Sequence, residues 1–208
     1  MPDYALEQEL GGIVCGIDEA GRGPWAGPVV AGAAVLDMAR LPDDLCTGLD
    51  DSKKLTARRR DALFAALTAA RDAGAVDFAI GTASVEEIDT VNILQATFRA
   101  MERAVAALAR APDHALIDGT GIPKGLPCPG RAVPKGDGLS LSIAAASIVA
   151  KVSRDRMMAA LDETCPGYGF ATHAGYGTAA HRAALERLGV TPHHRKSFAP
   201  IHKMLYGR

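Results

Sequence analysis

Four acidic residues in this sequence stand where the folded chain could gather them around a divalent metal ion. Asp18 and Glu19 follow one short apolar run, and Asp118 follows another. If these runs are neighbouring strands, their acids emerge at the same edge of a sheet, where Asp137 could join them. Carboxylates without histidine or cysteine partners are hard oxygen ligands, which suit Mg²⁺ or Mn²⁺. Two such ions about 4 Å apart could activate a water and stabilise the leaving oxygen in phosphodiester hydrolysis.

Glycines and basic residues near these acids point to a substrate rich in phosphate. The turn Gly21-Arg22-Gly23 can bring backbone N–H groups close to a ligand, because neither glycine has a Cβ in the way. Arg22 adds a forked cation that suits a phosphate. Lys53 lies in a charged loop, and the chain from Pro192 onward has no acid but carries His193, His194, Arg195, Lys196, Lys203 and Arg208.

Each of these features also has a purely structural explanation. Gly21-Arg22-Gly23 could be an ordinary charged turn, and Lys53 could sit in a solvated loop. Asp137 precedes a long helical pattern, where a carboxylate suits the helix dipole without any ligand. Two separate apolar runs that both end in Asp are harder to explain in this way, and they favour a functional role for the acids.

The alternation of apolar runs and helical patterns predicts an α/β or mixed-sheet domain. Strands are predicted at residues 13–17, 29–36, 76–81 and 114–119, with a short one near 131–133. Helices are predicted over about 56–73, 92–108, 140–161 and 178–188. The first two strands are close enough in sequence to pair antiparallel.

Local signals place the helix ends and their packing faces. Ser84 and Glu87 form a capping box, and Asn92 can cap the longer helix that follows. That helix carries an apolar stripe, which predicts core packing: Leu94, Phe98, Met101, Val105 and Leu108. The three alanines at 144–146 would allow a neighbouring element to approach the helix over 140–161 closely.

Composition sets limits on the class of protein. The chain has 208 residues, a formal net charge of −1, and four cysteines without any CxxC pair, so a zinc site or a disulfide framework is not expected. No apolar run approaches membrane-spanning length, and no signal-peptide pattern opens the chain, which predicts a cytoplasmic protein. Beyond residue 163 the sequence becomes rich in aromatic residues and glycine. We therefore predict a catalytic domain over 1–162 and a substrate-binding extension over 163–208.

Other functional classes fit the sequence less well. A nucleotide-binding fold is disfavoured, because Gly21 and Gly23 have no third glycine in fingerprint register and no Walker sequence exists. A serine or cysteine hydrolase would need a GxSxG elbow, which is absent, and Cys15 sits within a predicted buried strand. A nucleic-acid binding module that uses the basic tail stays open, although it does not explain the paired Asp-terminated strands.

Taken together, these motifs resemble the ribonuclease HII family, the type 2 ribonucleases H. The resemblance runs in order across nearly the whole chain. Its pieces are Gly16-Ile17-Asp18-Glu19-Ala20-Gly21-Arg22-Gly23-Pro24, Asp51-Ser52-Lys53-Lys54-Leu55, Ile88-Asp89 with Asn92-Ile93-Leu94, Ile117-Asp118-Gly119, Lys135-Gly136-Asp137, the helix segment 145–155, Gly175-Tyr176-Gly177-Thr178 with His181, and His193-His194-Arg195-Lys196-Ser197-Phe198.

The resemblance implies a ribonuclease H-like mixed β-sheet flanked by helices, with a small C-terminal helical extension. It also implies an endonuclease that cleaves the RNA strand of RNA/DNA hybrids and incises duplex DNA 5′ to a single ribonucleotide, leaving 3′-hydroxyl and 5′-phosphate ends. Such an enzyme would remove ribonucleotides during DNA replication and repair. The implied cofactor is Mg²⁺ or Mn²⁺. The implied binding partners are these duplexes, no membrane association is expected, and the enzyme would be a monomer.

Carried over by motif, the catalytic metal ligands would be Asp18, Glu19, Asp118 and Asp137, the last placed by its Lys-Gly-Asp context. The loop Gly21-Arg22-Gly23 would read the ribose 2′-hydroxyl, and Tyr176 would stack on the following deoxyribose. The residues implied to hold phosphates are Lys53, Arg195 and Lys196. A different two-metal nuclease of the same fold class, such as a junction resolvase, is the alternative, and it would not need the 2′-hydroxyl.

Overall fold

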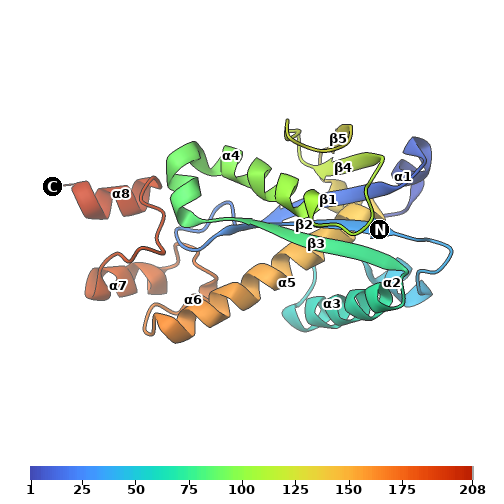
Figure 1. Ribbon diagram of the computed structural model, residues 1–208. Helices are drawn as coiled ribbons and strands as arrows, with labels where there is room; N and C mark the ends of the chain where they lie inside the picture. The colour runs from blue at the N-terminus through green and yellow to red at the C-terminus, as the bar shows by residue number, and fades with distance from the viewer. Residues whose placement is uncertain (208) are drawn as a thin grey trace.

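A five-stranded mixed sheet forms the centre of the protein, in the strand order β3-β2-β1-β4-β5 (Figure 1). The computed structural model describes residues 1–207, so Arg208 of the predicted basic tail lies outside the described residues. The strands are β1 (Val14–Ala20), β2 (Val29–Leu36), β3 (Val76–Ala83), β4 (His114–Asp118) and β5 (Gly130–Val133). Strands β1, β2 and β3 pair antiparallel, whereas β4 pairs parallel with β1 and β5 pairs parallel with β4. The predicted fold class and the pairing of the first two strands are confirmed.

Helices cover both faces of this sheet and one end of it. They are α1 (Ala5–Leu10), α2 (Asp43–Gly48), α3 (Ala57–Asp72), α4 (Val85–Ala106), α5 (Leu141–Thr164), α6 (Phe170–His173), α7 (Ala179–Leu188) and α8 (Ala199–Tyr206), with a 3₁₀ turn at Gly136–Gly138. Helix α4 lies on one face, and α5 with α3 lies on the other (Figure 1). None of the helices within residues 1–207 is long and apolar enough to span a membrane.

Helix α5 lies unusually close to the middle of the sheet. A Cβ built on Gly16 of β1 would lie 2.1 Å from the backbone carbon of Ser142, and one on Gly32 of β2 would lie 2.4 Å from the carbonyl oxygen of Ala146. Only glycine leaves room for backbone at these two positions, and the alanines of α5 supply the matching small surface. The close approach predicted for residues 144–146 is therefore confirmed.

Helix α4 begins where it was predicted to begin, but its buried face differs in part from the predicted apolar stripe. Both halves of the Ser84–Glu87 capping box are present, and Asn92, at a φ of 71°, interrupts the helix while its side chain accepts a hydrogen bond from the N–H of Gln95. Met101 and Val105 are buried as expected, but Leu94 is 42% exposed, so the predicted stripe is wrong there. Small residues make the close contact instead, because a Cβ on Gly81 of β3 would lie 2.1 Å from the carbonyl oxygen of Ala100.

The chain departs from the sequence-based prediction at the end of β1, whereas the C-terminal helical extension that the resemblance implies is present. Strand β1 continues through both acids to Ala20, because its ladder with β2 persists as far as the pair Ala20 and Val30. The tail forms helix α8, and α6, α7 and α8 gather at one end of the molecule (Figure 1). Tyr168 and Phe170 are buried in the core of this group. The proposed domain boundary at residue 162 lies inside α5 and stays a prediction.

We predict that Gly16→Ala destabilises the protein, because the new methyl group would force α5 away from the sheet. We expect the free energy of unfolding to fall by about 1–3 kcal/mol or more, the usual cost of overpacking a core. Denaturant unfolding measures this change. Gly138→Ala is the matched control, since its nearest neighbour would be the Lys54 Nζ at 3.8 Å. Equal stability of the two variants would contradict the prediction.

Candidate active site

Three aspartates from three separate segments meet at one edge of the sheet. Carboxylate oxygens of Asp18, Asp118 and Asp137 all lie within 4.8 Å of one another. Asp18 lies near the end of β1 and Asp118 ends β4, and because these strands are parallel neighbours their carboxyl ends meet. Asp137 arrives on the 3₁₀ turn, which the Asp118 carboxylate holds by accepting the N–H of Gly136 at 2.7 Å. The structure thus brings together three of the four predicted acids.

Glu19, the fourth predicted acid, lies beside this group but takes a different partner. Adjacent residues on a strand point to opposite faces, and β1 stays regular through both acids. The Glu19 Oε1 therefore pairs with Arg22, at 3.3 Å, while its N–H donates to the Asp18 carboxylate. Burial raises the pKa of Glu19 in spite of Arg22. Glu19 is therefore not one of the three clustered acids. As a neighbouring carboxylate it could still complete an ion site.

The aspartate cluster carries more negative charge than the protein itself offsets. Burial raises the pKa of Asp18 well above its usual value, and Glu19 and Asp118 raise it further. Burial and Asp118 also raise the pKa of Asp137. These shifts mean that the clustered carboxylates repel one another in a partly desolvated place. All the donors are oxygens of carboxylates, which is the chemistry that Mg²⁺ or Mn²⁺ requires.

Lys53 faces the same cluster from the loop before α3. Its Nζ lies 4.0 Å from Asp137 Oδ2, and its side chain is otherwise 70% exposed. Burial lowers the pKa of Lys53, but four nearby aspartates outweigh this and raise it overall. One of the four, Asp51, was missed as a site residue, although it stands two positions before Lys53. Lys53 is thus a positively charged side chain next to the cluster, and it is exposed enough for a phosphate to reach it.

The loop after β1 lies directly beside Tyr176. Gly21 has a φ of 98°, a conformation that favours glycine, and a Cβ on Gly23 would lie 3.6 Å from the Tyr176 ring. The loop Gly21-Arg22-Gly23, Lys53 and Tyr176 line a hollow of about 210 Å³. A second hollow, of about 550 Å³, is lined by Asp118, Asp137 and again Lys53. Lys53 lines both hollows, so the loop and the acids lie next to each other on the surface.

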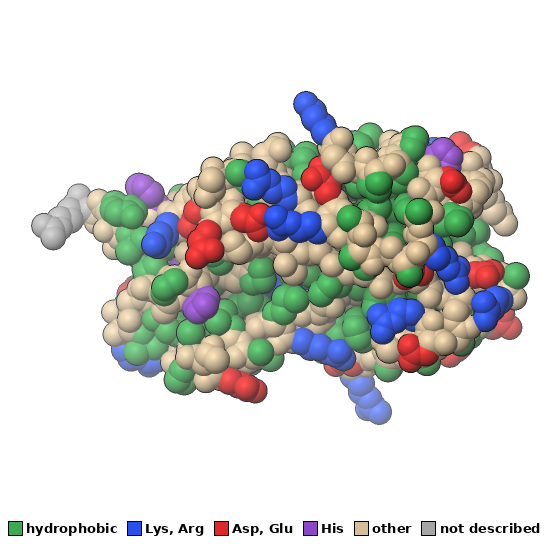
Figure 2. Space-filling model, in the orientation of Figure 1, with side chains coloured by type: hydrophobic (Ala, Val, Ile, Leu, Met, Phe, Trp, Pro, Cys, Tyr) green, Lys and Arg blue, Asp and Glu red, His purple; other side chains and the backbone are tan. Residues whose placement is uncertain are grey.

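The tail residues Arg195 and Lys196 lie in opposite environments. Lys196 is exposed, and its N–H donates to the Asp89 carboxylate at 3.0 Å. Arg195 is 0% exposed, and its guanidinium donates only to backbone carbonyls of the loop after β1. The predicted phosphate contact of Arg195 is therefore wrong, because no phosphate can reach a side chain that is enclosed and already bonded. On the face shown in Figure 2, basic side chains alternate with acidic ones instead of forming one broad basic patch.

Arg154, the residue with the second buried guanidinium, was also missed as a site residue. It is 1% exposed and donates to the carbonyls of Pro28, Ala26 and Ala174. A signal for it exists in the sequence, because it lies four residues from Ala150 and four from Met158 on the buried stripe of α5. A lone arginine on such a stripe indicates a buried polar contact.

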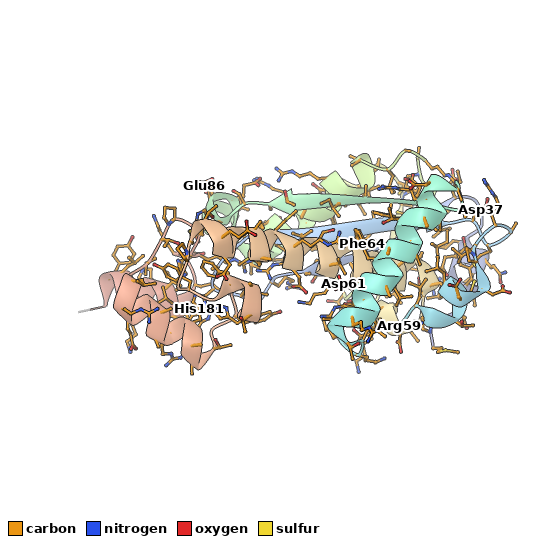
Figure 3. The ribbon with its side chains drawn as sticks, turned by 90° about the horizontal axis from the view of Figure 1, so that it is seen from below. Asp37, Arg59, Asp61, Phe64, Glu86 and His181 are labelled. Atoms are coloured by element: carbon orange, nitrogen blue, oxygen red, sulfur yellow. The ribbon has the colours of Figure 1, made fainter. Side chains whose placement is uncertain are left out.

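A buried pair of histidines anchors the segment that carries Tyr176. The Nε2 atoms of His181 and His194 are 3.0 Å apart, and His181 lies among the C-terminal helices (Figure 3). Because the N–H of Thr191 donates to His194 Nδ1, neutral His194 must hold its proton on Nε2 and donate it to His181. His181 then donates from Nδ1 to the carbonyl of Tyr176, at 2.9 Å. A proton added to this pair would set two N–H groups against each other.

Burial lowers the pKa values of both histidines, and that of His194 falls to about 4, with His181 as the second cause. The nearby His173 stacks on His181 at a ring separation of 4.5 Å, and it is held by the Tyr168 carbonyl. The neutral pair is therefore the form that the folded protein selects at neutral pH.

Comparison with known proteins gives one consistent result. The family model described as "Ribonuclease HII" matches residues 15–204. The chain is 62% identical to the ribonuclease HII of Paramagnetospirillum magneticum, over 97% of both chains. It is 60% identical to that of Jannaschia sp., over 99% of both. Among solved structures, ribonuclease H2 of Pyrococcus horikoshii OT3 superposes with a TM-score of 0.73 at 28% identity, covering 93% of this chain and 97% of that one.

We predict that Asp18→Asn leaves the metal-free protein as stable as the wild type or more stable. The raised pKa of Asp18 means that the folded state holds its charge unfavourably, so the neutral amide relieves repulsion. Mg²⁺ should raise the melting temperature of the wild type, as any ligand of the native state does, and should raise that of the variant much less. Asp61→Asn, on the exposed face of α3 (Figure 3), is the control. Equal Mg²⁺ shifts in all three proteins would refute the assignment of the ion site.

A second prediction concerns acid pH and the His181–His194 pair. An unfolded histidine titrates near 6.5, whereas folded His194 titrates at about 4. Between these values the unfolded state binds more protons, so the stability that this group provides falls as pH drops from about 6.5 to about 4. Urea unfolding at several pH values should show the wild-type advantage over His194→Gln shrinking across this window. An advantage that stays constant from neutral to acid pH would exclude this explanation.

Proposed function

Because the chain belongs to the ribonuclease HII family, whose members are endonucleases acting on RNA/DNA hybrids, we propose that it also incises duplex DNA on the 5′ side of a single ribonucleotide. The observation that carries this proposal is the aspartate cluster next to the hollow formed by Gly21, Gly23 and Tyr176. The aspartate cluster can hold cations and a scissile phosphate, and the hollow can hold the sugar beside that phosphate. Removal of ribonucleotides during DNA replication and repair is the role that such an activity would serve.

The proposed metal ligands are Asp18, Asp118 and Asp137, with Glu19 beside them. They offer only carboxylate oxygens, and family members depend on divalent metals, so Mg²⁺ or Mn²⁺ fits the site. When bound, two such ions supply an activated water and stabilisation of the leaving 3′ oxygen, which accounts for 3′-hydroxyl and 5′-phosphate products. The protein's own contribution is to hold the carboxylates close together before the ions and the substrate arrive.

Selection of a ribonucleotide is assigned to the loop Gly21-Arg22-Gly23 and to Tyr176. Backbone N–H groups of a glycine-flanked loop can bond a 2′-hydroxyl, which is the group that distinguishes RNA from DNA. Tyr176 is 48% exposed, so its ring can stack on the next sugar, where a deoxyribose fits and a ribose would crowd it. Lys53 and the exposed Lys196 are the proposed phosphate contacts. That the protein acts as a monomer in the cytoplasm stays a prediction.

The test is cleavage of a labelled duplex that contains one ribonucleotide, beside an all-DNA duplex and a uniform RNA/DNA hybrid. With Mg²⁺ or Mn²⁺ we expect a cut only 5′ to the ribonucleotide, and we expect Asp18→Asn to lose at least about 10³ in rate, since electrostatic stabilisation is the largest catalytic term. Cleavage of the all-DNA duplex would favour a resolvase-type nuclease instead. Metal-independent binding without cleavage of any duplex would favour a binding module.

Tyr176→Ala tests the stacking role separately. We expect it to lower the rate at the RNA–DNA junction more than the rate within the uniform hybrid, because only the junction presents a deoxyribose to the ring. Loss of one stacking contact corresponds to about 1–3 kcal/mol, or roughly 5- to 150-fold. The Mg²⁺ dependence should not change, since the ring does not touch the cluster. An unchanged ratio between the two substrates would rule the role out.

A further inference from the structure

The buried guanidinium of Arg195 makes five hydrogen bonds, and two of them go to the loop proposed to read the ribose. Its Nη2 donates to the carbonyl of Gly21 at 2.6 Å, and its Nη1 donates to the carbonyl of Arg22 at 2.9 Å. Its other bonds go to the carbonyls of Gly27 and Pro28, at 2.9–3.2 Å. Within residues 1–207 no carboxylate lies at ion-pair distance from it. A buried arginine with only carbonyl partners serves to set the direction of the backbone.

The planarity of the peptide bond determines in which direction the N–H groups of this loop point. In a trans peptide the C=O and the following N–H point in opposite directions, and no cis peptide occurs in the described chain. Since the carbonyls of Gly21 and Arg22 point inward at Arg195, the N–H groups of Arg22 and Gly23 must point outward. Two successive N–H groups are thereby presented on the side of the loop away from Arg195, next to the hollow that Gly21, Arg22 and Gly23 line.

Arg154 adds a second support under the same loop and connects it to the Tyr176 segment. A Cβ on Gly21 would lie 2.0 Å from Arg154 Nε, so the loop rests directly on this guanidinium. Arg154 also donates to the carbonyl of Ala174, and the N–H of Trp25 donates to the carbonyl of Gly175 at 2.9 Å. The backbone N–H of Arg195 donates to Trp25 in turn, at 2.8 Å. The loop and the Tyr176 segment are therefore held as one unit.

We propose that Arg195 is a positioning residue for ribonucleotide recognition, which aims the N–H groups of Arg22 and Gly23 at the ribose 2′-hydroxyl. This inference rests on the proposed function and deepens it. A guanidinium suits the task because it offers five donors in a rigid fork, enough to hold several carbonyls at once. A lysine would keep the charge with three donors on one atom, and it cannot hold the same set.

The positive charge of Arg195 also favours the binding of a nucleic acid at this loop. Burial and the neighbouring Arg154 lower its pKa to about 9, so it remains a cation at neutral pH. Two cations without carboxylate partners under one loop raise the electrostatic potential at its outer surface, where a phosphate would lie. Carbonyl dipoles offset the desolvation of the two charges without cancelling them.

The first test measures binding in an Asp18→Asn background, which blocks hydrolysis. Dissociation constants are compared for a duplex with one ribonucleotide and for the same duplex in DNA alone, with and without Arg195→Lys. We expect the substitution to lower the preference for the ribonucleotide about tenfold or more, as two misplaced hydrogen bonds would, and to change affinity for the DNA duplex by less than about twofold. The control is Arg187→Lys, an arginine at the end of α7 that donates to the carbonyl of Gly167 on the surface.

The outcomes separate this inference from the proposed function. If the Asp18→Asn parent binds both duplexes equally, the proposed function fails and the inference fails with it. If the parent prefers the ribonucleotide and Arg195→Lys keeps that preference in a folded protein, the inference alone is overturned. Reduced preference in Arg195→Lys but not in Arg187→Lys supports it.

A second measurement needs no substitution at Arg195 and holds even if that variant does not fold. Residue-resolved amide hydrogen exchange follows Arg22 and Gly23 in the Asp18→Asn protein. Outward N–H groups should exchange fast in the free protein, and they should be protected by the ribonucleotide duplex at least about tenfold more than by the DNA duplex. Slow exchange in the free protein, or equal protection by both duplexes, would overturn the inference.

Discussion

The close approach of three carboxylates is the constraint on which the rest of this structure depends. Asp18, Asp118 and Asp137 repel one another within 4.8 Å, and the desolvation of Asp18 adds to the cost. The parallel pairing of β1 and β4 makes two of them meet, and the bond from the N–H of Gly136 to Asp118 brings the third. An arrangement that is unfavourable alone becomes favourable once cations occupy it. The site is therefore rigid before it is filled, and function is obtained at some loss of stability.

Helix α5 supplies much of that rigidity. It lies against the backbone of β1 and β2, where Gly16 and Gly32 leave no gap to be filled by side chains. The same helix carries Ser147, whose hydroxyl bonds Ser52 in the loop of Lys53 at 2.8 Å, and Arg154, which supports the loop after β1. One helix thus couples the sheet, the lysine loop and the recognition loop. A shift of α5 would move all of them together.

The C-terminal segment acts mainly from behind the site. Arg195 points into the protein and holds carbonyls, whereas its neighbour Lys196 is exposed. The His181–His194 pair supports the Tyr176 carbonyl through a chain of hydrogen bonds that requires both rings to be neutral. Two residues of the tail that reads as a basic arm in the sequence, His194 and Arg195, are buried and support two loops from inside the protein.

The sequence by itself determined the strands, the longer helices and the acids, but not the short helices α1, α2, α6 and α8. Apolar runs, the Ser84 capping box and the Asn92 cap are local signals, since each acts over a few residues, and all were predicted. Two apolar runs, each followed by Asp, predicted for the same reason that these acids meet at one edge of the sheet. Leu94 and the direction of Arg195 could not be predicted, because burial depends on what packs against a residue from far along the chain. Arg195 meets Gly21 across 174 positions of sequence. Only the tertiary structure decided which charges face the solvent and which hold the backbone, because that choice is made by contacts that no local pattern encodes.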